Sequence, residues 1–336
     1  MSMATVSQGG TSTWNRPMLL LAYAMVPATL VALAGLVIDD RVLGGMPIWA
    51  KPLKFTLSIG LYAITWSWLA SLTTRAPKLV RRMSVAIVWL MVVELVLITG
   101  QVIRGRASHF NNETEFDHRI YHAMGVSITL IWLLTLGLTL IVMRSEIHDL
   151  AQKWAIRIGT VLSLIGAAFG PVMALPTDAQ AAEMRAGLNP AALGSHSVGV
   201  PDGGPGLPLV GWSTTGGDLR IPHFLGLHAL QALPLLALVL TLLAAQVPLL
   251  RSELVRVRLV LVGGAGFTGL LALVSWQAFR GQPLIHPDGW TSAAFCLLVA
   301  GVVAGIAWAC RAAVADRSGP DAEKALTAAD RHETAG

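Results

Sequence analysis

The sequence is poor in charged residues, and this shortage narrows the kinds of protein it can encode. Charged residues make up 13% of the 336 positions, 54% belong to the hydrophobic set, and the mean hydropathy is +0.63. A soluble domain keeps about a quarter of its residues charged, so the composition argues against a water-soluble globule. A disordered chain is excluded too, because disorder goes with low apolar content and high net charge, and the net charge here is +5.

Cysteine is almost absent, which removes another set of functions. Cys296 and Cys310 are the two cysteines. On one helix they would lie about 21 Å apart at 1.5 Å per residue, beyond the reach of a disulfide. No disulfide framework, CxxC pair or thiolate metal site is therefore available. The chain also lacks zinc-finger spacing and basic-aromatic interleaving, so no nucleic-acid partner is expected.

Long apolar runs are what the sequence does have. A helix that crosses the bilayer core needs about 20 apolar residues, and eight runs reach that length. They are Pro17–Val37, Leu53–Leu72, Met83–Ile103, Ile120–Met143, Trp154–Leu175, His223–Val247, Arg258–Phe279 and Thr291–Cys310. We therefore predict an all-α, polytopic integral membrane bundle of eight transmembrane helices.

The basic residues predict the orientation of this bundle. Residues 1–16 are polar and precede an apolar run without a cleavage site, which favours a retained first span over a signal peptide. With this segment in the cytoplasm, the inner segments, termini included, carry 15 of the 24 lysines and arginines, as the positive-inside rule requires. We expect a cell-membrane protein with both termini cytoplasmic, a membrane domain over 17–311 and a disordered tail over 312–336. The basic loops would contact anionic lipids of the bilayer.

Two short sequence patterns that occur twice suggest an internal duplication. The pattern QxxRG occurs at Gln101–Gly105 and Gln277–Gly281, at the same end of the third and seventh spans. KPLKF at Lys51–Phe55 and IPHFL at Ile221–Leu225 each follow a Gly-Gly pair at the start of a span. They predict a 4+4 parallel repeat, with coincidence among interface residues as the alternative. The halves would be residues 17–144 and 154–311.

A glycine pattern in the seventh span resembles a nucleotide-binding motif but lacks its context. Gly264, Gly266 and Gly269 spell GxGxxG without a preceding strand, so a dinucleotide site is rejected. Close helix packing explains these glycines, and Gly301 and Gly305 in the last span are interpreted in the same way.

Histidines provide the candidate cofactor ligands. Most of the nine lie on the outer side in this topology. His118 and His122 are four residues apart and share a helical face, directly after Asp117. His122 and His228 occupy similar depths in the fourth and sixth spans, which suits haem b between two imidazoles or a divalent transition metal held with His118 and Asp117. The alternative for each histidine is an ordinary hydrogen-bonded residue at the membrane interface.

An acidic residue inside the third span is the candidate catalytic group. Glu94 falls near the membrane midplane, where an ionised carboxylate costs several kcal/mol. Gln101 shares its face and leads outward to Arg104, so the three define a polar path. Glu94 is predicted to handle a proton or contact substrate, or else to be protonated and hydrogen-bonded to a neighbouring helix. Arg104 and Arg280 could bind haem propionates or lipid phosphate, with simple headgroup anchoring as the alternative.

The longest connection is a Gly- and Pro-rich outer loop over residues 176–221. Loops of this length are usually functional or disordered. Because it precedes the histidines of the sixth span, we predict that it covers an outer-facing polar pocket as a lid. A short interfacial helix is expected at Asp178–Gly187.

The span count, the 4+4 pattern and the outer histidines resemble the architecture of haem A synthases. That family places a histidine in spans two, four, six and eight, whereas spans two and eight here contain none and only His122 and His228 occupy comparable places. The chain is therefore not assigned to that family.

Three hypotheses about function follow, and the sequence leaves open whether the protein is an enzyme. The first is a membrane protein with an outer histidine-rich pocket that binds haem or a transition metal and exchanges electrons with quinone or another small lipophilic ligand. The second is a cofactor-free transporter or lipid-handling protein that uses Glu94, Gln101 and Arg104. The third is a metal-dependent membrane hydrolase that uses the outer histidines and acidic residues.

Overall fold

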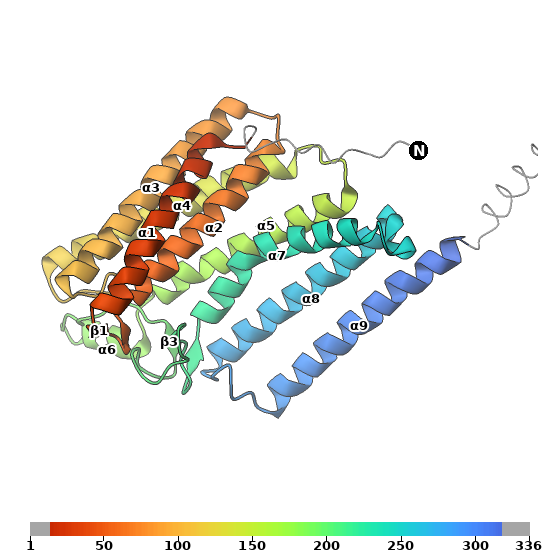
Figure 1. The fold of residues 1–336 in the computed structure, drawn as a ribbon. Coiled ribbons are helices and arrows are strands. Elements are labelled where there is room, and N and C mark those ends of the chain that lie inside the picture. Colours follow the sequence, from red (N-terminus) through yellow and green to blue (C-terminus); the bar gives the residue numbers. More distant parts are fainter. Residues whose placement is uncertain (1–13, 318–336) are drawn as a thin grey trace, which may run out of the picture. The chain divides into compact units, whose positions relative to one another are not determined.

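The computed structural model of the protein describes residues 14–317. Their regular secondary structure is helical apart from two pairs of two-residue strands (Figure 1). In chain order the elements are α1 (Arg16–Ile38), β1 (Val42–Leu43), β2 (Met46–Pro47), α2 (Ala50–Ser71), α3 (Pro77–Arg104), α4 (Glu115–Met143), α5 (Leu150–Met173), α6 (Asp178–Arg185), β3 (Ser197–Val198), β4 (Gly217–Asp218), α7 (Arg220–Leu243), the 3-10 helix η2 (Pro248–Arg251), α8 (Glu253–Phe279) and α9 (Gly289–Arg317). The predicted tail beyond Arg317 and most of the predicted N-terminal segment 1–16 lie outside the described residues.

The prediction of a helical membrane protein is confirmed. Within residues 14–317, seven helices are long and apolar enough to cross a membrane: α1, α3, α4, α5, α7, α8 and α9. Helix α2 has the necessary length, at 22 residues, but Lys51 and Lys54 in its first turns and several hydroxyl side chains lower its hydropathy. Its role as an eighth span stays a prediction.

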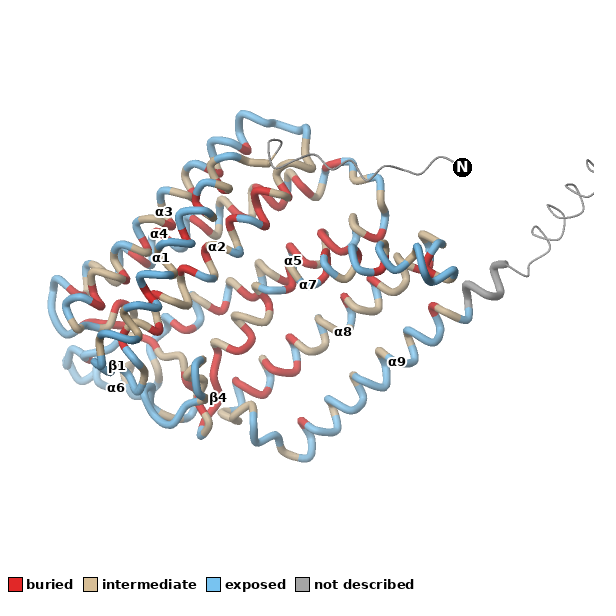
Figure 2. Tube along the Cα trace, in the orientation of Figure 1, coloured by how far each residue is buried: buried red, intermediate tan, exposed pale blue. Residues whose placement is uncertain are grey.

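Several helices expose large apolar side chains, as lipid-facing helices do. Leu297 of α9 is 73% exposed and Leu30 of α1 is 62% exposed, and Figure 2 shows α9 exposed along most of its length. In water such continuous apolar surface would be unfavourable by about 25 cal/mol per Å², and soluble monomers rarely carry it. Hydrocarbon removes this penalty, which explains why these faces remain uncovered by protein.

Side-chain caps fix where several helices begin. The side chain of Asn15 accepts a hydrogen bond from a backbone N–H in the first turn of α1, and Thr114 does the same for α4. Thr177 and Gln180 form a reciprocal capping box at the start of α6, in which each side chain satisfies one backbone N–H. Helix α6 confirms the short helix expected at this position.

The chain divides into two compact units. The first contains residues 14–146, 161–227 and 274–287, and the second contains residues 147–160, 228–273 and 288–317. The first unit thus holds α1 to α4 and the long loop, with parts of α5, α7 and α8. The predicted halves 17–144 and 154–311 stay a prediction.

In the first unit, α1 to α4 run side by side (Figure 1). Helix α2 packs against α1, α3 and α4, and nine of its 22 residues are buried, a larger share than in α1, α3 or α4. Trp66 and Leu69 of α2, Ile87 and Ile98 of α3, and Leu138 of α4 are fully buried. Their apolar contacts hold the four helices together.

Three segments meet at one end of these helices, which we call the loop end: residues 39–49, 105–114 and 174–219. β1 pairs with β2 and β3 with β4, both antiparallel. Hydrogen bonds join the segments to each other and to the helices: Arg41 Nη1 donates to Ile103 O at 3.3 Å, and Asn112 Nδ2 donates to Pro190 O at 2.9 Å. The long loop is therefore packed onto the ends of the helices.

The glycines of α8 lie against neighbouring helices of the second unit. A Cβ atom on Gly264, Gly266 or Gly269 would fall within 3 Å of a side chain of another helix. Gly305 of α9 has a similarly close neighbour at 3.0 Å. Helix packing is thus confirmed for these four positions and is wrong for Gly301, which has open space around it in the described chain.

Two other glycines bring α5 and α7 into backbone contact within the first unit. A Cβ on Gly166 would lie 2.5 Å from Leu227 N, and a Cβ on Gly226 would lie 2.5 Å from the Cα of Gly166. Small residues permit this approach. As a result, His223 Nδ1 reaches Gly166 O at 2.8 Å.

Replacing Gly166 with Ala should separate these two helices and destabilise the fold. Overpacking of this kind costs about 1–3 kcal/mol, so the melting temperature of the detergent-solubilised protein should fall by several degrees. Gly125→Ala in α4 is the matched control, because nothing lies within 4 Å of its added Cβ and alanine favours a helix. Equal melting temperatures for the two variants would contradict the close crossing.

Candidate functional site

The two histidines predicted to hold a haem belong to different units. His122 of α4 is in the first unit and His228 of α7 is in the second, and both side chains are exposed. Their convergence stays a prediction. His118 and His122 do share one face of α4, with ring centroids 6.4 Å apart. Among the described residues, the buried Nδ1 of His118 has no hydrogen-bond partner.

The carboxylate oxygens of Asp117 accept hydrogen bonds from other side chains of the protein. Its Oδ1 accepts from Gln101 Nε2 at 2.9 Å and from Arg104 Nη1 at 2.7 Å, and its Oδ2 accepts from Thr114 Oγ1 at 2.7 Å. Arg104 also donates to Gln101 Oε1 and lies over the ring of Phe116. This network ties the end of α3 to the start of α4, which gives Asp117, Gln101 and Arg104 a structural role.

The two QxxRG sequences form the same helix ending. Gly105 and Gly281 both have a left-handed φ, near +70°, and the residue after each donates its N–H back to the carbonyl of the motif's glutamine, as in a Schellman motif. Gln101 and Gln277 are buried, and each side chain donates to the carbonyl six residues on. Arg280 lies 4.4 Å from the centroid of a tryptophan ring. The repeated QxxRG pattern therefore has a local structural explanation.

Glu94 is buried in α3. Only 4% of the residue is exposed, and in the described chain its Oε1 has no hydrogen-bond partner. Gln101 lies seven residues on and is 1% exposed, so the predicted polar path from Glu94 to Arg104 follows an interior face. Lys51 of α2 is the charged side chain that interacts electrostatically with Glu94.

Lys51 and Lys54 both lie in the first turns of α2, but their surroundings differ. Lys54 Nζ donates to Val210 O at 2.9 Å and to Met46 Sδ at 3.5 Å. Half-buried Lys51 forms no hydrogen bond or ion pair with any residue in the described range. An ammonium group has three donors to satisfy, and no protein acceptor in the described range takes one of them from Lys51.

The segment after α3 has a strained backbone. Phe110 has a φ of +61°, a left-handed conformation that costs an L residue about 1–2 kcal/mol. Backbone hydrogen bonds to the long loop hold it: Phe110 O accepts from Leu193 N, and Asn112 N donates to Ala191 O, both at 2.9 Å. Such strain persists where the surroundings require it, and here it fixes the position of the preceding residue, His109.

His109 is packed among aromatic and cationic groups. Its ring centroid lies 5.8 Å from that of Phe55. Burial lowers the pKa of His109 well below its usual range. The positive charge of Lys51 lowers this pKa further, as would a proton on His196 or His223, because a nearby cation disfavours a second one. His109 is therefore a neutral imidazole at physiological pH.

His196 and Asp202 form a hydrogen-bonded pair. His196 Nδ1 and its backbone N both lie 2.9 Å from Asp202 Oδ2, and Ser195 Oγ and Ser197 N donate to Asp202 Oδ1. Burial lowers the pKa of His196, and the bond to Asp202 opposes this only in part. Burial would raise the pKa of Asp202, but its hydrogen bonds, first from His196, bring it below the usual range. Asp202 thus orients a neutral imidazole.

Arg220, the first residue of α7, forms an ion pair with Asp218. Arg220 Nε and Nη2 donate to Asp218 Oδ1 and Oδ2 at 2.9 and 2.6 Å, the bidentate geometry that gives strong, oriented pairs. The Asp218 side chain is fully buried and also accepts from Ser213 N. Arg220 Nη2 further donates to Gly211 O.

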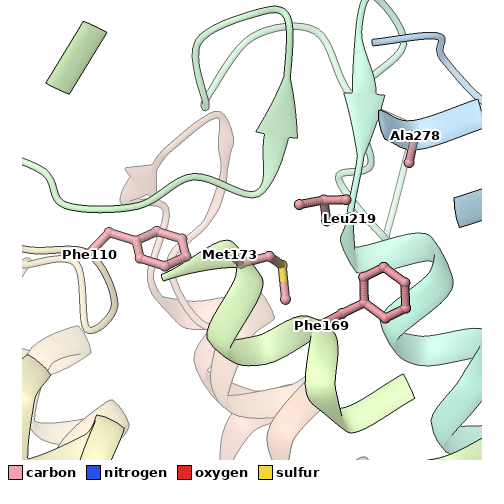
Figure 3. Close-up of a cluster of buried hydrophobic side chains, with 5 residues drawn as sticks. All are labelled: Phe110, Phe169, Met173, Leu219 and Ala278. Atoms are coloured by element: carbon pink, nitrogen blue, oxygen red, sulfur yellow. The ribbon is translucent and has the colours of Figure 1, made fainter. Parts of the chain in front are cut away.

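An apolar wall borders these polar groups. Phe110, Phe169, Met173, Leu219 and Ala278 form one buried cluster (Figure 3). The ring of Phe110 packs edge-on against that of His196, with centroids 4.7 Å apart. The wall excludes water on one side, which strengthens the electrostatic interactions of the neighbouring imidazoles.

We call Lys51, His109, His196, Asp202 and Arg220 the loop-end cluster. Lys51 interacts electrostatically with both histidines, and His196 with Asp202 and Arg220. The cluster combines an amino group without a protein partner in the described range, two neutral imidazoles, one of them oriented by Asp202, and the guanidinium of Arg220, so it can bind an anion and accept a proton. Over the described ranges, no group of three or more His, Cys, Asp or Glu side chains is placed to hold a metal ion.

Sequence reasoning did not find this cluster. Lys51 was noticed only as part of a repeated sequence pattern, and His109, His196 and Asp202 lie in loops separated by up to 93 positions. A usable signal did exist: two lysines open a segment that is otherwise apolar, and each of the histidines stands next to small polar residues in SHFNN and GSHS. Spacing alone could not show that these segments meet.

Comparison with known proteins adds no family to this description, because no family model, curated protein or solved structure matches the chain.

Acid should destabilise the loop end. Since the pKa values of His109 and His196 are lowered on folding, the unfolded chain binds protons more readily, and stability is lost as the pH falls below the unfolded value of about 6.5. The melting temperature should drop between pH 7 and pH 5, and His109→Gln should reduce the drop. Exposed His148→Gln is the control and should retain the full drop. A full acid loss in His109→Gln would refute this assignment.

Proposed function

We propose that the protein is a multi-pass membrane protein that binds a small oxyanion, free or as an anionic lipid headgroup, at the loop-end cluster. Lys51 carries the proposal, because its amino group lacks a hydrogen-bonding partner in the described chain and interacts electrostatically with His109 and His196. This is the cofactor-free transporter or lipid-handling hypothesis, with its binding centre moved from Arg104 to Lys51.

Missing hydrogen-bond acceptors support an anionic ligand. Asp218 neutralises Arg220, and the Asp202 carboxylate accepts hydrogen bonds from His196, Ser195 and Ser197 and acts on Lys51 only at a distance. The amino group of Lys51 is left without a direct partner in a half-buried place, where a charge is unfavourable without one. An oxyanion supplies both the opposite charge and the acceptors that an ammonium group needs.

We also propose that α2 spans the membrane as the eighth helix, with both termini in the cytoplasm of a cell-membrane protein. Helix α2 packs against three other helices, and polar residues in a span are tolerated when they face a bundle interior. In this orientation the loop end lies outside. The matching ends of α3 and α8, and the short strand pairs that precede α2 and α7, support the 4+4 repeat.

Binding of sulfate tests the proposed function. The purified full chain in detergent should bind sulfate saturably at constant ionic strength, as measured by calorimetry. Lys51→Met should weaken binding about ten- to a hundredfold, because a hydrogen bond to a charged group contributes about 1.5–3 kcal/mol. Its melting temperature without sulfate should stay near that of the wild type, since Lys51 has no bond to lose.

Lys78→Met is the matched control. Lys78 lies at the end of α3 that is remote from the loop end, in a groove with Arg81 and Arg82. This variant should bind sulfate like the wild type. A short-chain phosphatidate, added in the same assay, separates the two ligand sources: much tighter binding than sulfate indicates a headgroup. Undiminished binding by Lys51→Met would overturn the proposal.

The haem or metal hypothesis keeps one supporting observation, the shared face of His118 and His122 with an unpartnered Nδ1 on His118. If haem binds through His122 and His228, the purified protein should show a Soret band that His228→Ala removes. If a metal binds through His118, His122, Asp117 and His228, elemental analysis should find it in a stoichiometric amount. A colourless, metal-free protein would rule out both forms, and with them the hydrolase.

A further inference from the structure

The hydrogen bond between His196 and Asp202 fixes which nitrogen of the imidazole carries the proton. His196 Nδ1 lies 2.9 Å from Asp202 Oδ2. The same carboxylate accepts from His196 N at 2.9 Å, from Ser195 Oγ at 3.0 Å and from Ser197 N at 2.8 Å. An ionised carboxylate only accepts hydrogen bonds, so Nδ1 is the donor. Because the ring is neutral, its other nitrogen, Nε2, has a free lone pair and is an acceptor.

This Nε2 atom is available to a ligand. It has no hydrogen-bond partner in the described chain, and 27% of the His196 side chain is exposed. Asp202 polarises the ring from the opposite side, which makes Nε2 a stronger acceptor. His109 gives no comparable assignment, because its Nδ1 lies 3.2 Å from Ser108 Oγ and a hydroxyl group can donate or accept.

Ring contacts connect His196 to the first turns of α2. Phe55 lies four residues after Lys51 and shares its helical face. The ring centroid of Phe55 is 5.8 Å from that of His109, and the ring centroid of the next residue, Phe110, is 4.7 Å from that of His196. Lys51 and His196 thus belong to one packed group of side chains, in agreement with the electrostatic interaction between them.

A second cation lies beside His196. Leu219 N donates to His196 O at 2.9 Å, and Arg220 is the next residue along the chain. The pairing of β3 with β4, in which Ser197 is opposite Asp218, holds the same two segments together. The amino group of Lys51 and the guanidinium of Arg220 therefore accompany one lone-pair acceptor, and an ordinary anion offers no donor to that acceptor.

We propose that the loop-end cluster selects oxyanions that carry a proton, namely hydrogen phosphate or a phosphate monoester, over fully ionised oxyanions such as sulfate. This inference rests on the proposed function, since it assumes that an oxyanion binds at Lys51. The P–OH group donates to His196 Nε2, while another oxygen accepts from the amino group of Lys51. Sulfate has no proton at neutral pH, so it leaves Nε2 without a donor, which is unfavourable in a partly buried site. His196 is then the residue that determines specificity.

A panel of four oxyanions tests this selectivity on the purified full chain in detergent. At pH 7.5 phosphate and arsenate are mainly dianions that keep one O–H, whereas sulfate and selenate are dianions without one. Arsenate and selenate are close in size, so this pair isolates the proton. By calorimetry, the wild type should bind phosphate about ten- to a hundredfold more tightly than sulfate, as expected for one hydrogen bond to a charged group. Arsenate should exceed selenate by a similar factor.

His196→Asn removes the acceptor and keeps the contact with Asp202. The amide nitrogen of asparagine falls near the position of Nδ1, and nothing replaces Nε2. This variant should bind sulfate as tightly as the wild type and lose the preference for phosphate. The matched control is His148→Asn, because His148 is exposed in the connection between α4 and α5, and it should keep the wild-type preference.

Equal affinities within both pairs in the wild type would overturn the inference and leave the proposed function intact, as would a full phosphate preference in His196→Asn. Binding of none of the four anions would refute the proposed function itself. If His196→Asn does not fold, the comparison of arsenate with selenate in the wild type still decides. Short-chain phosphatidate carries the same O–H donor as inorganic phosphate, so much tighter binding than phosphate identifies a lipid headgroup, and equal or weaker binding identifies free phosphate.

Discussion

The structure depends on one constraint: inside a bilayer, a polar group must find its partner within the protein. Helices meet this requirement for the backbone, and several charged side chains near the helix ends meet it through direct pairs. Arg104 binds Asp117, and Arg220 binds Asp218. Glu94 differs from these, because it is buried in α3 and its Oε1 has no partner within the described part of the chain.

The loop end exists because close backbone contacts hold distant segments together. Phe110, whose backbone is in the left-handed region, is hydrogen-bonded to the long loop. Gly194 of that loop leaves room for its ring, since a Cβ at Gly194 would lie 2.7 Å from the Phe110 ring. The glycine contact between α5 and α7 places His223 against a backbone carbonyl. These contacts position His109 and His196 with little freedom.

Several features could be predicted from the sequence because they depend on neighbours along the chain. The apolar runs give the helices, a capping box gives α6, and the GxGxxG glycines give close helix packing. The burial of Glu94 and its shared face with Gln101 follow from helical periodicity. Asp117 was placed with the histidines as a metal ligand, yet its oxygens are taken by Gln101, Arg104 and Thr114. The bonds from Gln101 and Arg104 bridge two helices and leave no trace in local spacing.

The sequence by itself determined that the chain is a helical membrane protein, because the length and composition of a span reflect only the thickness and dryness of the bilayer. It also determined which few residues break the apolar pattern. Only the tertiary structure decided which of them meet: it joined Lys51, His109 and His196, and it gave Asp117 a partner. The physical reason is that such contacts arise where loops fold back across 50 to 150 positions, and no periodicity along the chain records that path.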